Sequence, residues 1–162
     1  QLQSGRSTSD ELQHTLRDAL DQLKLSIDAI NLPAGDVAAL LANLRYRLQP
    51  RFAALDIELR WEVDELPLVA SLSHHDMRQL QYMLFEAISN LLQHAHCHEM
   101  RLQALVAQGD VVLRVVDDGV GFDIRAASGN GLASLRQRAE AIGAALHVSS
   151  EPGRTAVEIR LR

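Results

Sequence analysis

Cysteine, aromatic residues and long apolar runs are all scarce in this chain of 162 residues. The single cysteine, Cys97, excludes an internal disulfide and suits a reducing compartment. Aromatic residues make up 4% of the chain, so aliphatic side chains must fill the core. No apolar run approaches the ~20 residues that cross a bilayer, and no signal-peptide pattern opens the sequence. We expect a cytoplasmic domain, cut from a longer protein because the chain begins with Gln1 rather than Met.

An excess of positive charge is missing as well. The sequence has 16 Lys and Arg residues against 21 Asp and Glu residues, a formal charge of −5. This balance disfavours a nucleic-acid partner, because binding to phosphates usually needs a basic surface. The length is sufficient for one well-buried core.

The first part of the chain has helical periodicity. Residues 1–9 show no period and are predicted to form a flexible lead-in. After them, apolar residues recur at spacings of 4, 3, 4 and 3, which gives one helix stripe that resembles a coiled-coil or hairpin seam: Leu16, Leu20, Leu23, Ile27 and Ile30. Pro33 ends this helix, and Asp36 can cap a second helix that stops near Pro50. We assign 10–53 to an N-terminal helical segment.

Residues 54–162 are predicted to form the second unit, in which strands and helices alternate. The period of two over 57–63 indicates a half-buried strand, and a long helix over 74–96 follows, with Ser73 as its N-cap and Asp76 as capping-box partner. Later strands are predicted over 100–106, 111–116, 146–148 and 156–161, with a helix over 132–142. One mixed sheet with helices on one face buries this pattern, which defines a two-layer α/β sandwich.

The long helix carries the first group of polar residues that could do chemistry. Glu86, Asn90, Gln93 and His94 have offsets of 0, 4, 7 and 8, which places them on one face. A carboxylate and a carboxamide one turn apart suit a hard divalent cation such as Mg²⁺. The carboxylate could also polarise a water or a hydroxyl. A solvated polar face is the alternative interpretation.

A second group follows the apolar strand that ends near Val116. Asp117 can stop this strand with its carboxylate facing a pocket, where it could accept a hydrogen bond from an exocyclic amino group such as that of adenine. Gly119 and Gly121 allow the backbone to approach a flat ring closely. The alternative is a tight turn, since Asp-Gly is a common turn dipeptide.

The third group is glycine-rich and comes directly before a helix. Gly129 and Gly131, followed by Leu132, can present backbone N–H groups to an anion, assisted by the helix dipole. Helix-entry geometry alone is the alternative. The dinucleotide fingerprint and the Walker loop are absent from the sequence, which disfavours Rossmann and P-loop proteins.

The order and spacing of the three groups resemble the GHKL nucleotide-binding superfamily. The closest resemblance is to the catalytic ATP-binding domain of a bacterial sensor histidine kinase, in the subfamily paired with LuxR/NarL-type response regulators. The stretch FEAISNLLQHAH is similar to the family's N box, DDGVGFD to its G1 box, and GNGLASLRQRAEAIGA to its G2 box. The resemblance implies the Bergerat ATP-binding fold, with ATP and Mg²⁺ as cofactors.

Roles for individual residues follow from this resemblance. Asn90 would ligate Mg²⁺, Glu86 would be the acid/base carboxylate of the N box, and Asp117 would bind the adenine amino group. Thr155 resembles the threonine near the adenine in the last strand pair. The remaining ATP-binding positions would be those of the N box and of the glycine-rich loop: Gln93, His94, Gly119, Gly121, Gly129, Gly131 and Leu132. Residues 122–128 would form a short lid over the nucleotide.

Two positions depart from the family pattern. Gln93 occupies the place of a usual lysine, which puts one phosphate contact in doubt. Arg154 replaces the glycine that usually precedes the threonine, which puts the local backbone in doubt.

The histidines support neither a zinc site nor a phospho-acceptor. His94, His96 and His98 with Cys97 lack zinc-ligand spacing, and on a helix they would point in different directions. The pair His75-Asp76 resembles the acceptor motif, but only ten residues lie between His75 and the N-box Glu86. His14 is followed by threonine instead of aspartate.

The resemblance therefore predicts the catalytic domain of an enzyme, a sensor histidine kinase. ATP's γ-phosphoryl group would pass to a histidine on a separate dimerisation domain, and then to a response regulator. The segment 10–31 resembles the tail of the second dimerisation helix, without the acceptor-bearing helix that would pair with it. The parent protein would be homodimeric, and the resemblance allows a membrane anchor. A GHKL regulator of the anti-sigma Ser-kinase type and a degenerate protein-interaction module are the alternatives.

Overall fold

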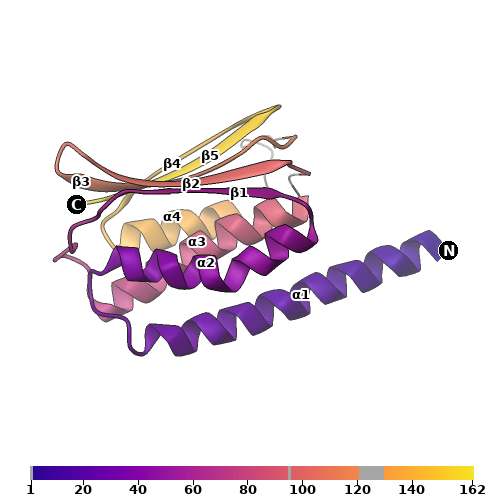
Figure 1. Ribbon diagram of the computed structural model, residues 1–162, viewed down its shortest axis with the longest axis horizontal. Helices are drawn as coiled ribbons and strands as arrows, with labels where there is room; N and C mark the ends of the chain where they lie inside the picture. Colours follow the sequence, from indigo (N-terminus) through magenta and orange to yellow (C-terminus); the bar gives the residue numbers. More distant parts are fainter. Residues whose placement is uncertain (1, 95, 121–129) are drawn as a thin grey trace.

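The computed structural model of the chain describes residues 2–94, 96–120 and 130–162, and the side chains of 2–4, 6, 7, 94, 130 and 131 lie outside that description. The elements in chain order are α1 (Leu2–Ala29), α2 (Val37–Ala54), β1 (Glu58–Val63), α3 (His74–His94), β2 (Glu99–Ala107), β3 (Asp110–Asp117), α4 (Asn130–Ala141), β4 (Ala145–Glu151) and β5 (Arg154–Leu161). Figure 1 shows the sheet as one layer, with α2, α3 and α4 beneath it and α1 outermost.

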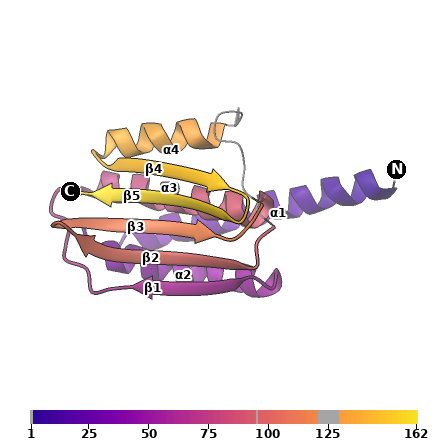
Figure 2. The ribbon, with the colours of Figure 1, turned by 90° about the horizontal axis from the view of Figure 1, so that it is seen from above.

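The sheet is mixed, as the sequence predicts. Its strand order is β1-β2-β3-β5-β4, in which β1 runs parallel to β2 and the other neighbours are antiparallel (Figure 2). The register places Asp117, the last residue of β3, opposite Thr155 on β5. Two residues separated widely in the sequence therefore meet at one end of the sheet.

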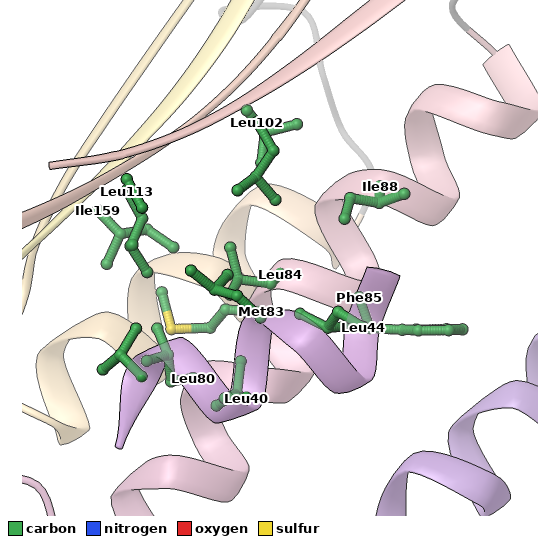
Figure 3. Close-up of a cluster of buried hydrophobic side chains, with 14 of the residues drawn as sticks. Leu40, Leu44, Leu80, Met83, Leu84, Phe85, Ile88, Leu102, Leu113 and Ile159 are labelled. Carbon is green, nitrogen blue, oxygen red and sulfur yellow. The ribbon is translucent and has the colours of Figure 1, made fainter. Parts of the chain in front are cut away.

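The core lies between the sheet and the middle layer of helices. Side chains from α2, α3 and the sheet interdigitate there (Figure 3), among them Leu40, Leu44, Leu80, Met83, Leu84, Ile88, Leu102, Leu113 and Ile159. The apolar residues of α3 recur at helical spacings of three and four, and those of the strands alternate. The apolar side chains of both elements therefore face the same core. The two-layer α/β sandwich is thereby confirmed.

The helix starts are capped by the residues that the sequence indicates. Asp36 accepts a hydrogen bond from the Ala39 N–H at 3.0 Å, which caps α2. Ser73 and Asp76 form a reciprocal capping box at α3: the Ser73 N–H donates to Asp76 at 3.0 Å, and the Asp76 N–H donates to Ser73 at 3.1 Å. These bonds fix where α3 begins.

Two predictions about the N-terminal helices were wrong. Helix α1 begins at Leu2, so the predicted lead-in 1–9 is helical from its second residue onward. The segment contains no proline, and extending a helix costs little once residues 10–29 have formed one. Helix α2 continues through Pro50 to Ala54, because Arg51 and Phe52 beyond the proline are buried. Burial of that last turn outweighs the hydrogen bond that Pro50 cannot donate.

The described residues contain no helix that is long and apolar enough to cross a membrane.

Candidate functional site

The polar face of α3 lies beside its buried stripe. Glu86 is half-buried, whereas Asn90 and Gln93 are exposed. Between them, Ile88 and Leu91 are buried in the core. The side chain of His94 lies outside the description. The helix thus holds a carboxylate and a carboxamide at the boundary between core and solvent.

Glu86 has a partner that the sequence analysis missed. The hydroxyl of Ser134, on α4, donates a hydrogen bond to Glu86 Oε2 at 3.3 Å. Burial raises the pKa of the Glu86 carboxyl, while the bond from Ser134 and the charge of Arg138 act to lower it. Ser134 and Arg138 are four residues apart on α4, which is the only sequence signal that they share a face.

Asp117 forms a buried polar corner at the end of β3. Asp117 is only 6% exposed, and its Oδ1 accepts a hydrogen bond from the Gly119 N–H at 2.8 Å. The Gly119 carbonyl in turn accepts from the Gly153 N–H at 2.9 Å. Burial raises the pKa of Asp117, the bond from Gly119 lowers it, and the neighbouring charge of Asp118 raises it further.

Thr155 lies on β5 opposite this corner and is buried. Its hydroxyl is 2.8 Å from that of Ser150, and either can donate. Ser150 is a second residue that the sequence analysis did not select. A carboxylate and two hydroxyls therefore lie together at one end of the adjacent strands β3, β5 and β4.

The departure at Arg154 leaves the strand pairing intact. Gly153 has a φ of 90°, a left-handed conformation that suits glycine in the turn between β4 and β5. Arg154 then pairs with Glu151 in the ladder. The turn is formed one residue before the position at which the family usually has its glycine.

Asp118 has a structural role next to the corner. Its Oδ1 accepts hydrogen bonds from the N–H groups of His98 at 2.8 Å and Glu99 at 3.0 Å. These bonds tie the entry of β2 to the end of β3, and they act to lower the pKa of Asp118. Within 2–94, 96–120 and 130–162, no group of three or more His, Cys, Asp or Glu residues could hold a metal ion.

The glycine positions are described only in part. Gly119 is buried, and Leu132 is half-buried in the first turns of α4. Gly131 belongs to α4, while Gly121, Gly129 and the predicted lid over 122–128 lie outside the described residues.

Comparisons with known proteins identify the family and the fold of the chain. The chain belongs to the family of histidine kinase-, DNA gyrase B- and HSP90-like ATPases, whose model matches residues 75–162. That range includes every residue selected above, from Glu86 to Thr155.

Two sensor histidine kinases of Bacillus subtilis (strain 168) are similar to the chain. LiaS is 29% identical over 108 residues, which are 65% of this chain and 29% of LiaS. DesK is 30% identical over 115 residues, which are 70% of this chain and 30% of DesK. The chain thus spans less than a third of the length of these curated relatives.

Solved histidine kinase structures share the fold. The histidine kinase domain of the Erythrobacter litoralis EL346 blue-light activated kinase has a TM-score of 0.70 and 20% identity, over 96% of this chain and 82% of that one. Full-length ShkA, solved in complex with AMPPNP, has a TM-score of 0.66 and 25% identity, over 96% of this chain and 36% of that one.

Proposed function

We propose that this chain is the catalytic ATP-binding domain of a sensor histidine kinase. It binds Mg·ATP and delivers the γ-phosphoryl group to a histidine on a dimerisation domain, from which a response regulator takes it. The observation that carries the proposal is the buried corner of Asp117, Gly119 and Thr155, which ends the central strands within a histidine kinase-like ATPase fold.

In this proposal Asp117 accepts the hydrogen bond of the adenine amino group, and Thr155 lines the same end of the sheet. A buried acceptor gives base selectivity, because a ligand without the donor leaves the carboxylate unpaired. The AMPPNP in ShkA supports an adenine nucleotide as the ligand of the fold.

The donor set on α3 fits Mg²⁺. Asn90 is exposed and offers an amide oxygen, and the Glu86 carboxylate lies one turn earlier on the same helix. Magnesium prefers oxygen ligands and keeps several waters, so one protein ligand together with phosphate oxygens is sufficient. The bound ion would neutralise charge on the phosphates. Glu86 would accept the proton of the attacking group, and transfer would otherwise depend on positioning.

The N-terminal helix supports a dimeric parent protein. The outward side chains of α1 form an apolar stripe, each member more than half exposed: Leu12, Leu16, Leu20, Leu23 and Ile27. We infer that this stripe packs against the acceptor-bearing helix of the dimerisation domain. A LuxR/NarL-type regulator as the final acceptor, and a membrane anchor in the parent protein, are further parts of the proposal.

Calorimetric titration of the chain with ATP, with and without Mg²⁺, tests the proposal. The wild-type chain should bind ATP more tightly with Mg²⁺ than without it, and more tightly than GTP. Asn90→Ala should lose the Mg²⁺-dependent part of the affinity while its thermal unfolding is unchanged, because the side chain is exposed. The same substitution at Asn31, an exposed residue between α1 and α2, is the matched control. Unchanged Mg·ATP affinity in Asn90→Ala would refute the assignment.

A further inference from the structure

A chain of two hydrogen bonds connects the Glu86 carboxylate to a charged residue on α4. The Nε of Arg138 donates to the hydroxyl oxygen of Ser134 at 3.3 Å. The same hydroxyl donates to Glu86 Oε2 at 3.3 Å. Because its oxygen already accepts from Arg138, the hydroxyl of Ser134 directs its hydrogen toward Glu86, and each bond polarises the other.

Arg138 is itself held in place from α3. Its Nη1 donates to Gln79 Oε1 at 2.5 Å, and its guanidinium lies over the ring of Tyr82, 4.0 Å from the ring centroid. Gln79, Tyr82 and Glu86 follow one another at spacings of three and four, so they share one face of α3. Three neutral contacts therefore fix the plane of the guanidinium.

Within the part of the chain that the structure describes, Arg138 forms no direct ion pair. Among the described residues, the ion pairs involve other arginines and His14. Arg138 is connected to the Glu86 carboxylate only through the hydroxyl of Ser134. Arg138 is half-buried, as is Glu86, so its field at the carboxylate is less screened than at the surface. A contact that served only to hold α4 against α3 would not need a positively charged donor to the Ser134 hydroxyl.

We propose that Arg138 is a positioning residue for phosphoryl transfer, which acts through Ser134 to hold the Glu86 carboxylate in one orientation toward the attacking group. The inference rests on the proposed function, in which Glu86 is the acid/base carboxylate. Burial raises the pKa of Glu86, and Ser134 and Arg138 oppose that rise, which agrees with this role because an ionised carboxylate is needed to accept a proton. Helix α4 begins in the glycine-rich segment, so the same helix joins the proposed phosphate site to Glu86.

Two measurements on the 162-residue chain test this role. The first is ATP turnover with water as acceptor, which gives ADP and phosphate, together with the affinity for Mg·ATP. We expect Ser134→Ala and Arg138→Gln to lower kcat by about tenfold, a fraction of what a general base contributes, and to change the affinity by less than about twofold. Ser134→Thr, which keeps the hydroxyl, should recover most of the turnover lost in Ser134→Ala.

Coupling to Glu86 distinguishes positioning from simple structural support. In a Glu86→Gln background, Arg138→Gln should cause no further loss of kcat, because both changes affect one unit. Arg136→Gln, an exposed arginine on the same helix, is the matched control and should leave kcat unchanged. An equal loss in the Glu86→Gln background, or the same loss in Arg136→Gln, would overturn the proposal.

The second measurement does not depend on nucleotide. The side-chain carboxyl ¹³C resonance of Glu86, assigned by its absence in Glu86→Gln, should move in both Ser134→Ala and Arg138→Gln but not in Arg136→Gln. A resonance that does not move in Arg138→Gln would overturn the positioning role while leaving ATP binding intact. Failure of the wild-type chain to bind Mg·ATP would instead overturn the proposed function.

Discussion

The hydroxyl of Ser89 donates a hydrogen bond to the carboxylate of Asp18, and this bond ties α1 to the helix that carries Asn90. The other Asp18 oxygen accepts from Arg51 Nη1 at 2.5 Å, and the Arg51 side chain is 7% exposed. The Nη2 of Arg51 lies 2.9 Å from His14 Nδ1. One face of α1 is therefore fixed by a half-buried polar network, and the opposite face presents the apolar stripe.

The first prediction concerns this network. Asp18→Ala should lower the free energy of unfolding by about 1–3 kcal/mol, because the buried Arg51 and Ser89 each lose one hydrogen-bond acceptor. Urea unfolding should show the change as a lower midpoint with an unchanged m-value. Asp10→Ala, an exposed aspartate on the same helix, should stay within about 0.5 kcal/mol of wild type. Equal stabilities of the two variants would show that the network does not hold α1.

The second prediction concerns pH and Asp117. Burial raises the pKa of this carboxyl, so it gains a proton at a higher pH than an exposed aspartate does. If the ionised form binds the adenine amino group, affinity for adenosine is full above the raised pKa and falls as the pH drops through it. Adenosine is the right probe because it carries no phosphate that titrates. Asp117→Asn should remove this dependence, and a wild-type affinity that is flat over the same range would contradict the assignment.

The third prediction uses Cys97 as a reporter of the same corner. Burial and the charges of Asp117 and Asp118 raise the pKa of its thiol to about 11. At pH 8 the thiolate fraction is about a hundredfold lower than for a thiol at the ordinary value of 9.0. Alkylation by iodoacetamide should therefore be much slower in the native chain than in urea.

The charge at Asp117 should also affect that rate. Asp117→Asn removes a negative charge near Cys97, which should lower the pKa of the thiol and speed its alkylation. Asp64→Asn, at the opposite end of the β1–β2 pair, is the control and should leave the rate unchanged. Equal native rates in wild type and Asp117→Asn would show that the two side chains do not interact.

The sequence was sufficient to predict the layers and the helix caps because both depend on local signals. Alternation over 57–63 and the spacing along 74–96 identify a strand and a helix without knowledge of their partners. Ser73 and Asp76 are three residues apart, so their capping box can be predicted from the sequence. Asp117 was selected from its position at the end of an apolar strand, and Thr155 through a family resemblance; the register of β3 and β5 places the two residues opposite each other.

What the sequence could not predict are contacts between distant elements. Ser134 and Arg138 approach Glu86 only because α4 packs beside α3, and no spacing along the chain encodes that neighbour. The same holds for Arg51, whose partners on α1 lie 33 and 37 residues away in the chain. Pro50 led to a wrong helix end because tertiary burial outweighed a local rule.

The fourth prediction concerns the exposed stripe of α1. One stripe per chain offers a limited apolar surface, so the chain should sediment as a monomer that associates only weakly. Leu16→Glu with Leu23→Glu should abolish that association and leave the free energy of unfolding within about 0.5 kcal/mol, since both side chains are exposed. Leu25→Ala, on the buried face, should cost about 2–5 kcal/mol. A tight dimer that survives the double substitution would show that another surface mediates association.

The fifth prediction concerns the phosphoryl acceptor. His75 lies in the first turn of α3, eleven residues before Glu86, which places it about 16 Å away along the helix axis. The ring of His14 contacts Arg51 at Nδ1 and Asp18 at Nε2, inside the network that holds α1. In-line transfer needs an acceptor within contact distance of the γ-phosphate, and neither histidine meets that condition if the nucleotide binds as proposed.

The chain should therefore bind γ-labelled ATP without acquiring acid-labile label, whereas a dimerisation domain of the parent protein, added separately, should become labelled. Acid-labile label on the chain itself at substantial stoichiometry would show that an acceptor lies within it, and its loss in His75→Ala would identify that residue.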